Sequence, residues 1–180
     1  KKYGQPFYST FDELTHSMSE EIAGMLGPSE PYCLFGHSMG AYAAIETAYQ
    51  MQKVHHNAPV MTILSGAASP YVAAKQEVGM SNEETIAYLR DIGGTEENVL
   101  KNRIFETELL PILQADLDTL RTYRFAHEGE LLPSYIVATY GQEDPAYRIG
   151  QVEDWKTAVG KDVVMQTFPE VGGQSGLRKT

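Results

Sequence analysis

The sequence is poor in basic residues and has no long apolar run. Only 14 Lys and Arg stand against 24 Asp and Glu, which gives a formal net charge of −10. This balance disfavours an extended phosphate-binding surface, so we expect no nucleic-acid partner. No stretch is long enough to span a bilayer, and no signal-peptide pattern opens the chain. We therefore expect a cytoplasmic protein with no membrane partner.

Cysteine is nearly absent. Cys33 cannot form an internal disulfide because the chain holds no second cysteine, which fits a reducing compartment. It lies in an apolar run, residues 31–35, and such a position predicts a buried thiol rather than a nucleophile.

The 180 residues, 42% of them hydrophobic, suffice for one well-cored domain, and we expect a single domain over residues 1–180. Thr10 and Glu13 form a capping-box pattern at the start of a helix over about 10–26, which Gly27 and Pro28 end. Apolar residues recur along it at helical spacing: Phe11, Leu14, Met18, Ile22 and Met25.

Strands and helices then alternate. Residues 31–35 and 60–64 read as strands, with a run of helix formers over 41–50 between them. A further strand signal covers 134–140, a helix surrounds Trp155, and a last strand covers 163–168. This order predicts an α/β fold, with a mostly parallel sheet covered by helices on both faces.

Between residues 68 and 130 the pattern is helical without strands, which predicts an inserted helical cap. Ser81 and Glu84 form a second capping box, and Gly93 and Gly94 end that helix. A longer helix carries an apolar stripe that either packs on the body of the protein or also lines an entrance to a site at the carboxyl ends of the strands: Leu109, Ile112, Leu113, Leu117, Leu120 and Tyr123.

The most informative motif joins the strand over 31–35 to the helix that follows it, and it reads Gly36-His37-Ser38-Met39-Gly40. A G-x-S-x-G sequence between a strand and a helix is typical of a nucleophile elbow, a strained turn that exposes a reactive serine. Gly36 and Gly40 would let backbone segments pass closely and tolerate unusual dihedrals. Ser38 is thus the predicted nucleophile, with the N–H of Met39 as an oxyanion donor at the helix N-terminus.

Such a serine needs an acid and a histidine on loops after later strands. Asp144 follows the strand over 134–140 and is the preferred acid, although a solvated turn carboxylate would look the same; Glu143 and Asp116 are lesser candidates. No histidine follows His127, and Gln174 lies where the loop after the last strand should supply it. Glutamine cannot accept the serine proton near neutral pH.

The other histidines are poor substitutes. His37 lies inside the tight elbow and should point away from its neighbour, while His127 would have to swing in from the end of the cap. His16, His55 and His56 occupy a helix or a polar loop, where surface roles are expected. A triad cannot be completed from these residues.

The chain resembles the type II thioesterases of nonribosomal peptide and polyketide synthesis, a branch of the α/β-hydrolases, over most of its length. The resemblance is carried by residues 31–41, Ser65-Gly66 with Pro70, Leu89, Gly93-Gly94-Thr95, Leu110-Pro111, Ala115-Asp116, Gly141, Asp144 and Trp155. It implies Ser38 as nucleophile, Asp144 as the acid and the Met39 N–H as oxyanion donor.

The resemblance also implies a reaction, the hydrolysis of acyl or aminoacyl thioesters on the phosphopantetheine arm of acyl or peptidyl carrier proteins, with no metal and no resident cofactor. Family members carry a Gly-Gly-His motif after the last strand, and about sixty more N-terminal residues. We therefore expect a domain that is incomplete at both ends.

Two alternatives stay open. One is a general serine carboxylester hydrolase or acyltransferase with the same elbow, and the other is a non-catalytic module that binds carrier proteins. Missing edge strands would leave backbone groups free to pair, so we also predict self-association.

Overall fold

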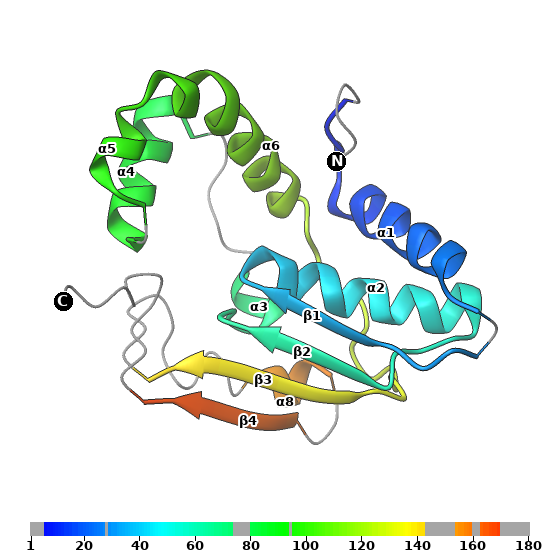
Figure 1. Ribbon diagram of the computed structural model, residues 1–180. Coiled ribbons are helices and arrows are strands. Elements are labelled where there is room, and N and C mark those ends of the chain that lie inside the picture. The colour runs from blue at the N-terminus through cyan, green and yellow to red at the C-terminus, as the bar shows by residue number, and fades with distance from the viewer. Residues whose placement is uncertain are drawn as a thin grey trace.

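The computed structural model describes residues 6–27, 29–73, 80–93, 95–142, 154–159 and 163–169. A four-stranded parallel sheet in the order β1-β2-β3-β4 forms its centre (Figure 1). The strands are β1 (Cys33–His37), β2 (Met61–Ser65), β3 (Tyr135–Gly141) and β4 (Val163–Phe168). Each strand predicted from the sequence is therefore present, displaced by no more than two residues.

The helices follow the expected alternation. They are α1 (Phe11–Met25), α2 (Met39–His55), α3 (Pro70–Ala73), α4 (Asn82–Ile92), α5 (Glu97–Leu100), α6 (Leu110–Arg121) and α8 (Trp155–Ala158), with a π-helical turn, η1 (Phe105–Leu109), before α6. Both capping signals are realised: Thr10 Oγ1 accepts the Glu13 N–H, and Ser81 and Glu84 form a reciprocal capping box. Local side-chain chemistry thus sets where α1 and α4 begin.

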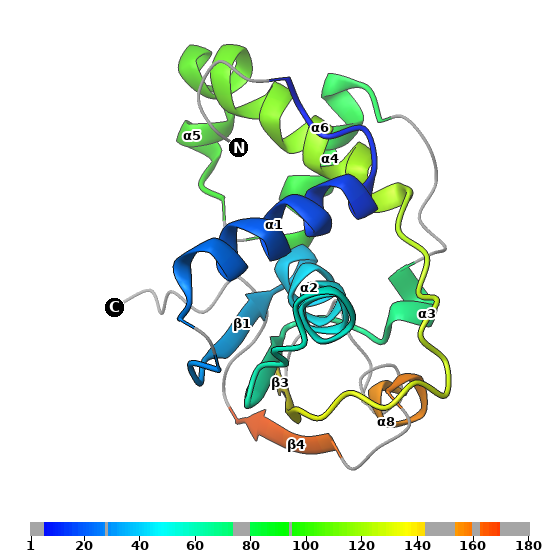
Figure 2. The same cartoon turned by 90° about the vertical axis from the view of Figure 1, so that its right-hand side faces the viewer.

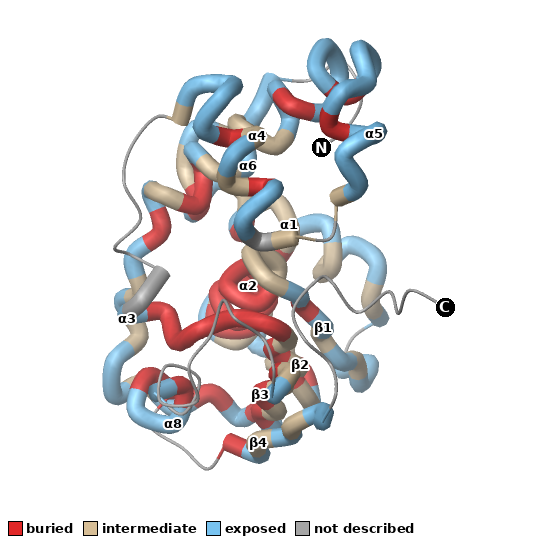
Figure 3. The backbone as a smooth tube through the Cα atoms, turned by 90° about the vertical axis from the view of Figure 1, so that its left-hand side faces the viewer, coloured by how far each residue is buried: buried red, intermediate tan, exposed pale blue. Residues whose placement is uncertain are grey.

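One face of the sheet, which we call the covered face, lies against helices. Figures 2 and 3 show α2, α3 and α8 on the same side of the strands. The residues pointing there are mostly buried, among them Leu64, Ile136, Ala138 and Val163. Trp155 of α8 is fully buried, and its Nε1–H donates to the Ala67 carbonyl at 3.0 Å. This side holds the main hydrophobic core.

The other face, which we call the open face, has no helix on it within the described part of the chain. Strand register places on it Cys33, Phe35, His37, Met61, Ile63, Ser65, Tyr135, Val137, Thr139, Gly141, Val164, Gln166 and Phe168. Four of its large apolar side chains are exposed, among them Phe35 at 67% and Tyr135 at 76%, whereas Met61, Ile63 and Val137 are half-buried. The prediction of helices on both faces is therefore met for one face only among the described residues.

The prediction of a buried Cys33 thiol is wrong for the same reason. Cys33 is exposed, because β1 is an edge strand and its odd-numbered residues point to the open face. An apolar run shows that a strand can be buried on both faces, but it does not supply the elements that cover it.

The apolar stripe predicted for α1 is confirmed at its N-terminal half, where Phe11 lies in the main core and Leu14 and Met18 pack against it. The side chains of α1 that are fully buried are Phe11, Thr15 and Ser19, whereas Met25 is 82% exposed. Thr15 and Ser19 are buried because they face Gln50 of α2, whose amide donates to Thr15 Oγ1 at 2.9 Å and accepts from Ser19 Oγ at 3.1 Å. The two hydroxyl groups of α1 thus satisfy the half-buried amide of Gln50.

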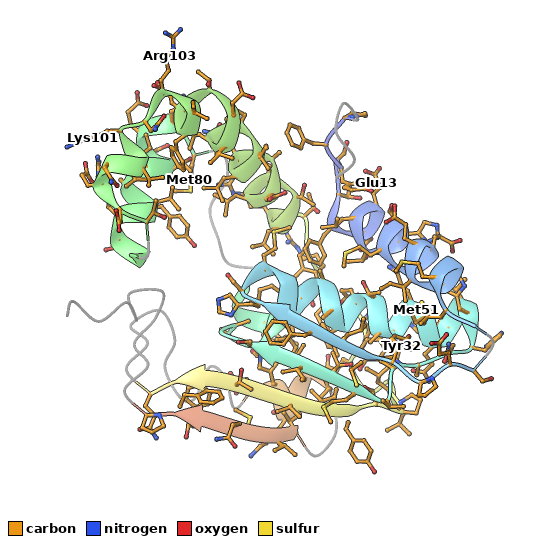
Figure 4. The ribbon with its side chains drawn as sticks, viewed as in Figure 1. Glu13, Tyr32, Met51, Met80, Lys101 and Arg103 are labelled. Carbon is orange, nitrogen blue, oxygen red and sulfur yellow. The ribbon has the colours of Figure 1, made fainter. Side chains whose placement is uncertain are left out.

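The segment between β2 and β3 carries α3 to α6, and α4 to α6 lie beyond α2 on the side of the strands' carboxyl ends (Figure 1). These helices have a small hydrophobic cluster of their own, formed by Leu89, Leu100, Phe105 and Leu110. Figure 4 shows Lys101 and Arg103 at its far end, pointing away from the sheet. The single domain and the cap boundaries of about 68–130 stay predictions.

The stripe along the longest helix of this segment divides between two clusters. Leu113 packs against the small cluster, whereas Leu120 and Tyr123 join the main core. Leu109 and Ile112 are exposed, at 50% and 42%. Part of the stripe thus packs on the body, as one of the two interpretations expected. No described helix has the length and apolarity to cross a membrane.

Candidate active site

The predicted elbow lies at the carboxyl end of β1. β1 ends at His37, Ser38 forms the turn and N-cap, and α2 begins at Met39. The Ser38 backbone has φ 54° and ψ −124°, a conformation that non-glycine residues rarely adopt. Such strain costs about 1–3 kcal/mol and persists only where the surroundings impose it. The strand-turn-helix context that the motif requires is present.

Backbone contacts hold this turn on two sides. The Ser38 N–H donates to the Ser65 carbonyl of β2 at 2.8 Å, and the Ala41 N–H donates to the Ser38 carbonyl at 2.9 Å. Gly36 passes so close to the start of α2 that an added Cβ would lie 1.9 Å from the Gly40 carbonyl oxygen. The elbow is therefore fixed by β2 and by the first turn of α2.

The two glycines of the motif have different roles, which corrects the sequence interpretation. A Cβ on Gly40 would meet nothing within 4 Å, so the steric demand falls on Gly36 alone. Neither glycine has a positive φ, and the unusual dihedrals belong to Ser38 itself. Close approach at Gly36, rather than glycine flexibility, shapes this turn.

Ser38 is half-buried, and its side chain makes no capping hydrogen bond at this helix N-terminus. Met39 is the first residue of α2, a helix of 17 residues, so its N–H lies at the positive end of the helix dipole. The structure thus brings Ser38 and the Met39 amide together at one helix end. That arrangement suits a serine nucleophile beside a donor for a developing oxyanion.

The predicted acid and the position of the expected base lie elsewhere. Asp144, Glu143 and Gln174 fall outside the described residues. β3 ends at Gly141 as the sequence predicted, so Asp144 follows it closely in the chain. Asp116 lies on α6 and lines a small pocket together with Phe7, Tyr8, Leu14, Ala115 and Thr119, none of which belongs to the elbow.

His127 lies in a network with α2. Its Nε2 is 2.7 Å from a carboxylate oxygen of the buried Glu46, and its Nδ1 is 3.1 Å from Glu130. The imidazole stacks on Tyr49, with ring centroids 4.0 Å apart, and Tyr123 donates to Glu46 at 3.0 Å. Glu46 lies about two helical turns along α2 from the elbow. The His127 ring is thus engaged with α2 and its surroundings rather than with Ser38.

This network shifts several pKa values. Burial lowers the pKa of His127, but hydrogen bonds to Glu46 and Glu130 and the charge of Glu46 outweigh it, so the net pKa is raised. The hydrogen bond from Lys53 lowers the pKa of Glu130. Burial and the charge of Glu46 raise the pKa of Tyr123. Sequence analysis missed this pairing because Glu46 and His127 lie 81 residues apart and no local pattern joins them.

The remaining histidines lie away from the elbow, except for His37. His16 is exposed on α1, His55 Nε2 lies 3.1 Å from Glu20 across the α1–α2 contact, and His56 ends α2 in the left-handed conformation. No group of three His, Cys, Asp or Glu side chains within the described ranges is arranged to hold a metal ion.

The Thioesterase domain family matches residues 1–170 of this sequence. The chain belongs to the thioesterase domain family. It is 27% identical over 163 residues to the gramicidin S biosynthesis protein GrsT of Aneurinibacillus migulanus, covering 89% of this chain and 62% of that protein. It is 26% identical over 163 residues to the rat medium-chain S-acyl fatty acid synthase thioesterase, covering 86% of this chain and 59% of that enzyme. The chain thus spans about three fifths of the length of these two relatives.

Among solved structures, the type II thioesterase BorB from the borrelidin biosynthetic cluster is similar with a TM-score of 0.73 at 27% identity, over 89% of this chain and 65% of BorB. The neighbours are thioesterases of the α/β-hydrolase fold. The predicted fold class and the resemblance to type II thioesterases are therefore confirmed.

Proposed function

We propose that this thioesterase domain hydrolyses acyl or aminoacyl thioesters carried on the phosphopantetheine arm of carrier proteins, with Ser38 as nucleophile. The observation that carries the proposal is the strained Ser38 at the N-terminus of α2, between the close passage at Gly36 and the hydrogen bond to β2. Similarity to GrsT, a gramicidin S biosynthesis protein, and to BorB, a type II thioesterase from the borrelidin biosynthetic cluster, supports the substrate class.

The reaction has two acyl transfers. Ser38 Oγ adds to the acyl carbon to give a tetrahedral intermediate, which collapses as the carbon–sulfur bond breaks, and the serine proton passes through a base to the departing thiolate. Water then attacks the acyl-serine, which releases the acid and restores the hydroxyl. In each tetrahedral intermediate the Met39 N–H donates to the oxyanion.

Asp144 is the proposed acid that would orient the base. Gln174 occupies the position that the family resemblance gives to histidine, and its amide cannot take the serine proton near neutral pH. Asp144 and an imidazole at 174 would complete the chain order serine, acid, histidine.

Turnover on an acyl-carrier protein, acyl-coenzyme A and a p-nitrophenyl ester tests the substrate class. We expect the carrier-bound thioester to be preferred. Ser38→Ala should abolish whatever gain in turnover an imidazole at position 174 brings, because the serine and its base act as one unit. A strong preference for the simple ester would instead support a general carboxylester hydrolase, and faster transfer to an added acyl acceptor than to water would support an acyltransferase.

Gln174→His tests the missing base. An imidazole at this position should raise the rate of turnover by about 10²- to 10⁴-fold, the range that general base catalysis contributes. Gln174→Asn, which keeps an amide, is the matched control and should change little. Rapid fluorophosphonate labelling of Ser38 should accompany the gain. A folded Gln174→His protein that binds carrier protein but neither turns over nor labels would point to the non-catalytic module.

A further inference from the structure

His37 lies directly before Ser38, yet its side chain points to the open face. It is the last residue of β1, where strand register pairs it with Ser65 of β2. Its Nδ1 lies 3.1 Å from Ser65 Oγ, within hydrogen-bond distance. The imidazole therefore links the carboxyl end of β1 to that of β2.

The ring also rests on Gly66. Gly66 has a positive φ of 54°, and a Cβ built there would lie 2.7 Å from His37 Cε1 and 3.2 Å from Nδ1. The imidazole thus occupies the space that any side chain at position 66 would need. Two kinds of contact, a hydrogen bond and close packing, hold Ser65 and Gly66 against His37.

Ser65 and Gly66 in turn hold the elbow. The Ser65 carbonyl accepts the Ser38 N–H at 2.8 Å, and the Gly66 N–H donates to the Thr139 carbonyl of β3 at 2.8 Å. The strained Ser38 backbone is therefore hydrogen-bonded to the Ser65–Gly66 turn. That turn is bonded to β3 on one side and packs against the His37 ring on the other. Any movement of this turn would be passed on to Ser38 through that hydrogen bond.

We propose that His37 is a positioning residue that holds Ser38 in its reactive conformation by fixing the Ser65–Gly66 turn. The inference rests on the proposed role of Ser38 as nucleophile. His37 takes no proton from Ser38 in this role, since it acts through Ser65 and Gly66.

Three variants of the 180-residue chain test the proposal. His37→Phe keeps a ring on Gly66 but removes Nδ1, His37→Asn returns a polar atom near the position of Nδ1, and Ser65→Ala removes the partner hydroxyl. Two rates are measured: hydrogen exchange of the Ser38 amide by NMR, and fluorophosphonate labelling of Ser38.

We expect His37→Phe to speed Ser38 amide exchange and to slow labelling by about tenfold, within the penalty that a displaced reacting group brings. His37→Asn should recover most of the labelling rate. Ser65→Ala combined with His37→Phe should be no slower than either single variant, because both remove the same contact. Phe35→Ala, on the same face two residues earlier, is the matched control and should leave both rates unchanged.

The proposal is overturned if folded His37→Phe keeps the wild-type rates of Ser38 amide exchange and labelling. It is also overturned if His37→Asn labels as slowly as His37→Phe and the two variants lose the same free energy of unfolding. If Ser38 labels in neither the wild-type nor the Gln174→His protein, the proposed nucleophile fails. In that case amide exchange alone tests the placement of the turn by His37. Exchange in His37→Phe that is faster than wild type at Ser38 but not at Leu64 supports it, and a wild-type exchange rate at Ser38 overturns it.

Discussion

The two faces of the four-stranded sheet differ in burial, although their residues are similar in type. Both are apolar: Leu64, Ile136 and Val163 point one way, and Phe35, Val137 and Val164 point the other. The first set is buried under α2 and α8, whereas Phe35 and Val164 are more than half exposed. Burial in this sheet is therefore decided by which elements cover a face, and strand composition only permits it.

The largest expected loss of stability comes from removing a buried side chain that packs against the covered face. Trp155→Ala should lower the free energy of unfolding by about 3–5 kcal/mol, because it removes a fully buried aromatic side chain and its hydrogen bond to Ala67. Urea unfolding followed by circular dichroism measures the loss. Phe35→Ala on the open face is the control, and its effect should stay within about 0.5 kcal/mol. Equal losses would mean that the open face is covered in solution.

Gly36→Ala comes next, since Gly36 points to the covered face where β1 meets α2. The added methyl would overlap the Gly40 carbonyl, so we expect a loss of about 1–3 kcal/mol. Gly40→Ala is the matched control, because its Cβ would enter open space and alanine favours a helix. Unfolding midpoints of the two variants check this prediction. A larger loss for Gly40→Ala would contradict the assignment of the close passage to Gly36.

Glu46→Gln probes the polar network behind the covered face. Replacing the charge-assisted hydrogen bond to His127 by a neutral one should cost about 1 kcal/mol near pH 6. Glu20→Gln, at the more exposed pair with His55, should cost less.

The pH dependence follows from the raised pKa of His127. A group whose pKa is higher in the folded than in the unfolded state stabilises the fold fully at pH values below its unfolded pKa, which is about 6.5 for histidine. This contribution is lost as the pH rises through the folded pKa. Wild-type stability should therefore decline above about pH 6.5, and the decline should be smaller in Glu46→Gln. An NMR titration of the His127 ring that is unchanged by Glu46→Gln would refute the pairing.

The smallest effect on stability is expected on the open face. Phe35→Lys should shift the free energy of unfolding by no more than about 0.5 kcal/mol, because the side chain is already exposed. If the predicted self-association uses this face, the same variant should weaken it through charge repulsion and desolvation. Sedimentation analysis compares it with Val54→Lys, at an exposed position on α2. Equal association of the two variants would place the contact elsewhere.

Local sequence signals predicted the elements well. The last strand matches residue for residue over 163–168, and Thr10 and Ser81 cap helices as expected. Those signals act within a few residues of each other. The burial of Cys33 was mispredicted because it depends on which other segments cover the strand, which no local pattern records.

The elbow was predictable because a short motif encodes a complete local geometry. The structure was needed to show that Gly36, and not Gly40, makes the close passage, and that the His37 ring packs against Gly66. Both findings depend on distances between backbone segments. Asp144 and Gln174 stay predictions from the motif order and the family resemblance.

The exposed Cys33 has a practical consequence. Because it is the chain's single thiol and points to the open face, its alkylation rate reports whether that face is accessible to solvent. A small maleimide should modify it quickly in the dispersed protein and slowly wherever another surface has closed over the sheet. One residue thus provides a chemical reporter, read by mass spectrometry, for contacts made by the open face.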